Sequence, residues 1–250
     1  MATASSSAAS YIRGRKPFKI STITDRSAII NGSAFFSGLS EPECHKVASC
    51  GQTRSFASEE LVFMQGQSAR HLVLIETGRV KQTQLSSNGN EVFLWMNRSG
   101  DVIGVPEESI SGSQSCSARV MEHCQALVWD YAKLQCLILE FPQIRQNIGQ
   151  ILSGRLNELQ ERFREVATEK VAQRLALALL RLLKQVGKPV REGIEISSSR
   201  DELAQMTGTT LFTISRILSR WGEEGFVLPR RAAVVVLDIQ RLRAVTTEGF

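Results

Sequence analysis

The chain has 250 residues, which suffices for one large domain or two ordinary ones, and its 42% hydrophobic residues can form real cores. No apolar run approaches the roughly 18 residues that span a bilayer, which excludes a membrane-spanning protein and predicts a soluble one. The net charge of +5 is concentrated at the ends: residues 1–28 carry five lysines and arginines against one acidic residue, and residues 169–250 carry thirteen against nine. Positive ends around an acidic middle favour a nucleic-acid partner.

The cysteines are odd in number and include no C-x-x-C pair. This spacing argues against a disulfide scaffold and a zinc site, so we expect no metal and a reducing cytoplasm. No set of nucleophile, base and oxyanion donor is evident, and we do not expect an enzyme. The five residues are Cys44, Cys50, Cys116, Cys124 and Cys136.

Residues 1–28 are rich in serine and alanine, basic and almost free of acid. An organelle transit peptide has a similar composition, but a clear amphipathic apolar face is missing here. We predict a basic disordered tail.

Residues 29–141 are predicted to form an antiparallel β-roll, similar to a double-stranded β-helix or jelly roll. Short alternating runs are separated by glycine, at a spacing of roughly 8 to 12 residues. The inside of such a barrel can hold one small ligand. The predicted strands are residues 61–63, 71–75, 79–85, 91–96, 117–121 and 126–130.

A long helix is predicted over residues 142–169, and its apolar residues repeat in steps of four and three. Such a heptad pattern could pack on its own domain, but no neighbouring helix of like length is evident. We therefore predict a dimerisation helix that pairs with a second copy of the chain. The predicted dimer interface is Leu152, Leu156, Leu159, Phe163 and Val166.

Residues 170–250 are predicted to form a winged helix. An apolar helix over residues 171–186 is followed by a strand near residues 194–198 and by two short helices. A β-hairpin with Arg230 and Arg231 at its tip and a closing helix over residues 239–245 complete the domain.

The two short helices carry the strongest functional signal in the chain. Ser199 is a candidate N-cap for the first helix, and Gly208 suits the left-handed turn between the two. Thr209 or Thr210 can then cap the second helix. The apolar residues of that helix recur at three- and four-residue spacing, which leaves its other face free for DNA. They are Ile214, Ile217, Leu218 and Trp221.

An ordinary helical hairpin is the plain alternative. Residues 203–222 contain two arginines and no acidic residue, which favours a surface that approaches phosphates. We predict that this segment binds double-stranded DNA. The candidate DNA-binding residues are Arg200, Thr209, Thr210, Leu211, Phe212, Thr213, Ser215, Arg216 and Arg220.

This order of β-roll, long helix and winged helix resembles the CRP/FNR family of bacterial transcription regulators. The resemblance covers roughly residues 35–247. Residues 202–218 carry it most strongly. The other segments that carry it are the F-S-G-L of residues 36–39, the H-L-V-L-I-E-T-G-R-V-K of residues 71–81 and the G-D-V-I-G of residues 100–104. It implies a homodimer that binds a palindromic operator through paired recognition helices and contacts RNA polymerase.

The same resemblance implies an effector pocket in the roll. Members that bind cyclic AMP hold its ribose with a Gly-Glu pair and its phosphate with an Arg-Ser pair, for which this chain has Gly104-Val105 and Cys116-Ser117. A Thr-Ser pair on the dimer helix corresponds to Leu159-Gln160. Losing one charge-assisted hydrogen bond costs about 1.5 to 3 kcal/mol, so we predict that the effector is not cyclic AMP. The candidate pocket is Gly104, Val105, Cys116, Ser117 and Leu159, with no cofactor predicted and the effector unknown.

Other sensing chemistries are less well supported. Iron–sulfur members need a cluster of N-terminal cysteines, which this chain lacks before Cys44. Haem could use His71, Cys116 or His123. Cys116 could also be a redox switch, with Arg119 nearby in sequence.

The recognition helix departs from the family pattern for a TGTGA-like half-site, which is Arg-Glu-x-x-x-Arg. Residues 211–216 match it at Arg216 alone, so we expect a different half-site, with Arg216 on a guanine. The runner-up function is a small-molecule, redox or haem sensor that signals through protein contacts.

Overall fold

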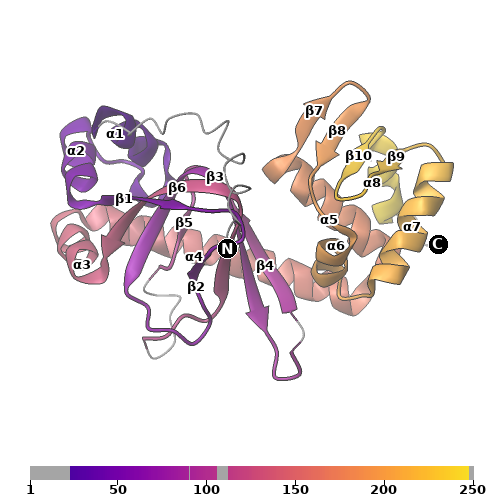
Figure 1. Cartoon of the computed structure of the whole chain (residues 1–250), viewed down its shortest axis with the longest axis horizontal. Coiled ribbons are helices and arrows are strands. Elements are labelled where there is room, and N and C mark those ends of the chain that lie inside the picture. Colours follow the sequence, from indigo (N-terminus) through magenta and orange to yellow (C-terminus); the bar gives the residue numbers. More distant parts are fainter. Residues whose placement is uncertain (1–22, 90, 106–111, 248–250) are drawn as a thin grey trace, which may run out of the picture.

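The computed structural model describes residues 23–89, 91–105 and 112–247 (Figure 1). Its N-terminal part is an antiparallel β-roll with flanking helices, and its C-terminal part is a helical domain with a small sheet. This architecture confirms the predicted α+β fold class. Over the described ranges, no helix is long and apolar enough to cross a bilayer.

The roll is built on the strand order β1-β6-β3-β4, with β2 paired to β6 and β5 paired to β3. All of these pairs are antiparallel. The strands are β1 (Gln52–Phe56), β2 (Leu61–Phe63), β3 (His71–Leu85), β4 (Glu91–Asn97), β5 (Val102–Ile103) and β6 (Ser117–Asp130).

Two of the strand predictions were wrong in the same way. Residues 71–75 and 79–85 belong to one strand, β3, and residues 117–121 and 126–130 belong to β6. Gly78 lies in the middle of β3 with φ of 90°, where a Cβ would lie 2.6 Å from the His123 carbonyl oxygen. The pairing of β3 with β6 shifts register on both sides of this glycine. The glycine therefore forms a bulge, at which the strand bends without ending.

Helices cover one end of the roll, and the sequence did not predict them. They are α1 (Ile23–Gly32), the 3-10 helix η1 (Ala34–Phe36), α2 (Glu41–Cys50) and α3 (Tyr131–Glu140). The predicted disordered tail of residues 1–28 is wrong for residues 23–28, because α1 buries Ile30 fully and Ser27 almost fully. The remainder of that prediction, residues 1–22, lies outside the described residues.

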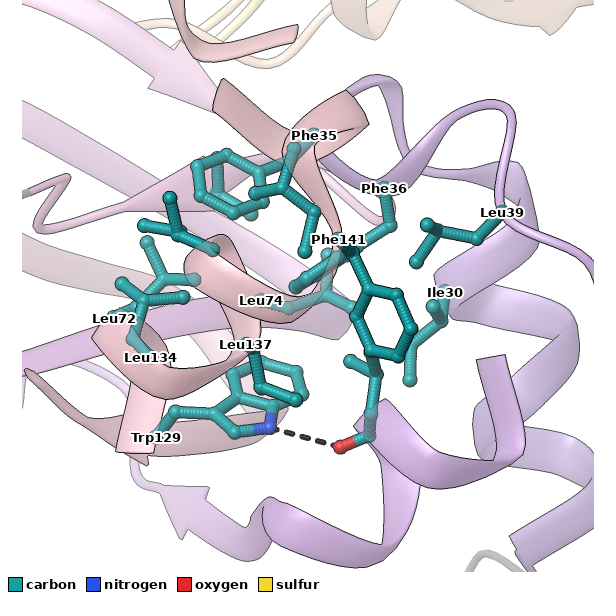
Figure 2. Packing of buried hydrophobic residues seen from close by; sticks show 14 of the residues in the cluster. Ile30, Phe35, Phe36, Leu39, Leu72, Leu74, Trp129, Leu134, Leu137 and Phe141 are labelled. Carbon is teal, nitrogen blue, oxygen red and sulfur yellow. Dashed lines mark hydrogen bonds between the residues drawn. The ribbon is translucent and has the colours of Figure 1, made fainter. Parts of the chain in front are cut away.

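These helices and the roll share one hydrophobic core (Figure 2). Trp129 at the end of β6 is fully buried, and its indole N–H donates a hydrogen bond to the Val47 carbonyl of α2 over 3.0 Å. Its ring lies 5.4 Å from that of Phe36 between ring centres. Burial of such large rings stabilises this core.

The predicted long helix is confirmed as α4 (Pro142–Thr168), which extends past the roll toward the C-terminal domain (Figure 1). That domain is a winged helix with its own core and a sheet of order β7-β8-β10-β9. β7 was not predicted. The elements are α5 (Val171–Val186), β7 (Lys188–Val190), β8 (Gly193–Ile196), α6 (Arg200–Thr207), α7 (Leu211–Glu223), β9 (Val227–Pro229), β10 (Val234–Val236) and α8 (Ile239–Thr247).

Candidate nucleic-acid interface and effector cavity

The first helix of the predicted helix-turn-helix, α6, begins with a reciprocal cap. Ser199 accepts a hydrogen bond from the Glu202 backbone N–H over 3.2 Å, and the Glu202 carboxylate accepts one from the Ser199 N–H over 2.8 Å. This arrangement satisfies two N–H groups that a helix otherwise leaves open. The N-cap prediction for Ser199 is confirmed, and Glu202 becomes a buried carboxylate at the start of α6.

The turn between α6 and α7 is formed by a left-handed glycine and a threonine cap. Gly208 adopts φ of 61°, in the left-handed region that a side chain disfavours. Thr210 is the cap of α7, because its hydroxyl oxygen accepts a hydrogen bond from the Thr213 N–H over 3.3 Å. The hydroxyl groups of Thr210 and Thr213 also lie 3.0 Å apart, within hydrogen-bonding distance. Of the two candidate caps, Thr209 is therefore not used.

α7 has one packed face and one free face, as predicted. Ile214 and Leu218 are fully buried in the domain core. On the other side Phe212 is 82% exposed and Leu211 is 41% exposed. Ser215 is half-buried, beside the exposed Arg216. Leu211 and Phe212 are adjacent, so together they expose apolar surface at the start of α7.

The arginines around α7 differ in how they are engaged. In the part of the chain that the structure describes, no hydrogen bond or ion pair engages Arg216. The Nε of Arg220 lies 2.8 Å from the Glu224 carboxylate. Arg200 donates from its Nη1 to the carbonyl oxygen of Arg230 over 3.2 Å, so it ties α6 to the wing. Arg216 is thus the cation best placed to contact a base.

The tip of the wing is less basic than its sequence indicates. Arg230 forms ion pairs with Glu195 over 2.5 Å and with Glu192 over 3.5 Å, both from the β7–β8 hairpin region. These carboxylates neutralise it and hold it against the sheet. Arg231 remains exposed at the tip.

The predicted dimer face of α4 is largely uncovered. Leu156 is 56% exposed, Leu159 is 41%, Phe163 is 78% and Val166 is 54%. Leu152, in contrast, is half-buried and packs on the core of its own roll. Four of the five predicted interface residues therefore form an apolar stripe that the chain itself leaves open.

The candidate effector residues lie in different surroundings. Val105 and Cys116 are buried, and Tyr131 donates its hydroxyl hydrogen to the Gly104 carbonyl oxygen over 2.7 Å. Ser117 accepts a hydrogen bond from the Gln65 N–H over 3.0 Å. It lines a groove on the outside of the roll, with Leu61 and Arg119 among its neighbours. Leu159 belongs to the exposed stripe of α4.

Cys116 is part of a buried polar chain that the sequence did not reveal. Gln82 donates from its Nε2 to the Cys116 sulfur over 3.3 Å, and Asn97 donates from its Nδ2 to the Gln82 Oε1 over 2.9 Å. All three side chains are less than 9% exposed. These groups are neutral amides and a thiol, which offer no cation to a cyclic phosphate.

Two arginines of α4 lie across Trp95 of β4, one heptad apart. The guanidinium carbons of Arg155 and Arg162 are 5.6 and 5.0 Å from the ring centre. Their hydrogen bonds to the roll go to the Val102 and Leu94 carbonyl oxygens, over 3.2 and 2.6 Å. Burial lowers the pKa of both guanidinium groups. A cavity of about 180 Å³ beside Trp95 and Arg155 also contains the carboxylates of Asp101 and Glu158.

The structure gives no support to the thiol-switch alternative. Burial raises the pKa of the Cys116 thiol, whereas reactive cysteines have a lowered pKa. Arg119 does not assist, because it donates to the Glu59 carbonyl oxygen over 2.9 Å.

The haem-ligand candidates have other partners. His71 lies 2.9 Å from the Asp130 carboxylate, and His123 lies 3.2 Å from the Ser55 hydroxyl oxygen. Among the described residues, no three His, Cys, Asp or Glu side chains gather as metal ligands.

Two family models match the chain. A cyclic nucleotide-binding domain matches residues 53–141, and a Crp-like helix-turn-helix domain matches residues 173–245. Together they cover both the roll and the DNA-binding domain.

Known proteins match over most of the chain. The cyclic AMP receptor protein of Thermus thermophilus is 29% identical, over 79% of this chain and 89% of that protein. The fumarate and nitrate reduction regulatory protein of Vibrio cholerae is 26% identical, over 75% of this chain and 77% of its own length. The structure of the c-di-GMP responsive global regulator CLP of Xanthomonas campestris is similar with a TM-score of 0.71 and 23% identity, covering 80% of this chain and all of that one.

These relatives are regulators of transcription and not enzymes. Both domain models, the relatives that match over most of the chain and the fold agree with the motifs of residues 71–81 and 202–218. The chain belongs to the CRP/FNR family of transcription regulators.

Proposed function

We propose that the chain acts as a homodimer in the cytoplasm, binds a palindromic operator through two copies of α7 and contacts RNA polymerase there. The observation that carries the operator proposal is the free face of α7, where Arg216 is unengaged among the described residues beside the exposed Phe212. A guanidinium in this position can bond to guanine O6 and N7, and an apolar side chain can contact a thymine methyl group.

The exposed stripe of α4 supports the dimer. Four large apolar side chains at heptad spacing are open to solvent in the single chain, and a second copy would bury them symmetrically. A dimer of this kind would place its two recognition helices about 34 Å apart, or one turn of duplex.

Binding-site selection from random duplexes, followed by genomic footprinting, tests this proposal. We expect a selected site with two-fold symmetry that differs from TGTGA in its half-site. Affinity should fall steeply with salt, because phosphate contacts release counterions. Failure to select any DNA sequence would refute the proposal and leave the sensor that signals through protein contacts.

We also propose that the effector domain does not respond to cyclic AMP, although several relatives are named for that nucleotide. The buried Val105 cannot accept the ribose hydrogen bond, and Cys116 is held by Gln82 in a neutral surrounding. Titration calorimetry should detect no binding, and a micromolar isotherm would contradict the proposal.

A further inference from the structure

The DNA-binding domain contacts the roll of the same chain through α6, the helix that precedes α7. Helix α6 packs beside strand β4, and Figure 1 shows the two next to each other. At this contact Lys81 of β3 is only 9% exposed. Its Nζ lies 3.9 Å from a Glu91 carboxylate oxygen of β4 and 3.9 Å from a Glu202 carboxylate oxygen of α6. The ammonium group therefore lies between one carboxylate of each domain.

A hydrogen bond runs parallel to this ion pair. Gln205 of α6 donates from its Nε2 to the Glu91 carboxylate over 3.3 Å. The other oxygen of Glu91 accepts a hydrogen bond from the Thr83 hydroxyl over 2.7 Å, which fixes the carboxylate on the roll. Two successive turns of α6, at Glu202 and Gln205, are thus attached to the hairpin of β3 and β4.

Glu202 links this contact to the DNA-binding surface. One of its oxygens faces Lys81, while the other caps α6 at the Ser199 N–H. α6 is joined to α7 through the short turn at Gly208, and the two helices pack together. A displacement of Glu202 therefore moves α6 and, together with it, the helix α7 that carries Arg216 and Phe212.

The contact specifies an orientation more than it adds stability. Burying a lysine has a large desolvation cost, which nearby carboxylates offset only if their geometry is maintained. If the DNA-binding domain rotated fully away from the roll, water would solvate the Lys81 ammonium group in place of the Glu202 carboxylate. In a partly docked orientation, that ammonium group would be buried without the Glu202 carboxylate. Such a group disfavours intermediate orientations.

We propose that Lys81 is a positioning residue for operator binding, which fixes the DNA-binding domain on the roll so that α7 faces outward. This role rests on the proposed homodimer. A symmetric operator has two half-sites at a fixed separation, so both recognition helices of the dimer must lie at that separation. A DNA-binding domain that is already held in the matching orientation loses less conformational freedom on binding. A single half-site makes no such demand.

Lys81→Glu tests the role, because it places three carboxylates together at the contact. We expect about tenfold weaker binding to the selected palindrome, with unchanged binding to a duplex that contains one half-site. Lys133→Glu is the matched control, because Lys133 is exposed on α3 and the charge change is the same. In Figure 1, α3 lies at the end of the roll opposite the DNA-binding domain.

Two further variants separate positioning from loss of fold. Gln205→Ala removes the parallel hydrogen bond and should weaken palindrome binding in the same direction by a smaller factor. The double variant Lys81→Glu/Glu91→Lys restores an opposite charge at the contact, and the new lysine can donate to the buried Gln205 Oε1, which lacks a hydrogen-bond partner in the described structure. We expect it to recover most of the affinity. Circular dichroism and thermal unfolding check the fold of each variant.

Small-angle X-ray scattering of the free protein supplies a readout that a merely structural role would not change. Lys81→Glu should have a larger radius of gyration than the wild type, and the charge-swapped variant should return to the wild-type value. Unchanged or tighter palindrome binding by Lys81→Glu, or equal weakening on the half-site, would overturn the positioning role alone. A wild-type protein that selects no palindrome would overturn the proposed function, and the positioning role with it.

Discussion

Phe163→Ala is expected to weaken the proposed dimer by a large, calculable amount. Phe163 is 78% exposed on α4 in the single chain, so most of its side chain is available for burial against a second copy. Full burial of a phenylalanine contributes about 1.5 to 3 kcal/mol, which gives about 2 kcal/mol for the exposed part. A two-fold interface contains two copies of each residue, so the variant loses about 4 kcal/mol of association free energy. That loss corresponds to a dimer Kd about 1000-fold higher.

Sedimentation velocity over a concentration series measures this Kd directly. Leu139→Ala is the matched control, since Leu139 on α3 is 74% exposed but lies off the predicted interface. We expect the control to dimerise like the wild type. An unchanged Kd in Phe163→Ala, with a dimeric wild type, would refute the heptad interface.

Three other measurements probe the rest of the molecule. Arg216→Ala should cost about 1 to 3 kcal/mol of operator affinity and relax the preference at one base pair. Repeated site selection with the variant would detect this change, and an unchanged selected site would contradict the base contact. Gly208→Val should lower the free energy of unfolding by about 1 to 2 kcal/mol in urea, because φ of 61° is unfavourable for a side chain, and an equally stable variant would exclude that strain. Burial raises the pKa of the Cys124 thiol from 9.0 to about 12, so the unfolded chain loses that proton first and the free energy of unfolding should fall as the pH rises through this window. Cys124→Ala should flatten that decline by up to about 1.4 kcal/mol per pH unit, and an identical decline in both proteins would exclude the thiol as its source.

Local signals made the DNA-binding helices predictable. Ser199, Gly208 and Thr210 each act through hydrogen bonds or dihedral angles within a few residues of themselves. The packed face of α7 was equally clear, because Ile214 and Leu218 repeat at helical spacing and tertiary contacts do not alter that period. Such patterns depend on the chain near them and can be recognised without the fold.

The strands of the roll and the helices around them were harder to predict, because contacts with distant parts of the chain decide them. Gly78 is typical of a turn, but β3 tolerates it because β6 supplies a long pairing partner on both sides of the bulge. α1 has a weak apolar pattern of its own, and it forms because Ile30 completes the core beside Phe36 and Leu39. Tertiary packing decided both cases, and the sequence pattern of one segment contains no trace of it.

The contact at Lys81 was beyond prediction because residues 81–84 are all polar, with the sequence K-Q-T-Q. A strand normally reveals its buried face by alternation of apolar and polar residues, and this stretch has none. Both of its faces are nevertheless covered: Gln82 bonds to Cys116 and Asn97 inside the roll, while Lys81 meets Glu202 on the outside. Buried polar groups on both faces require specific partners, since each unpaired group costs free energy.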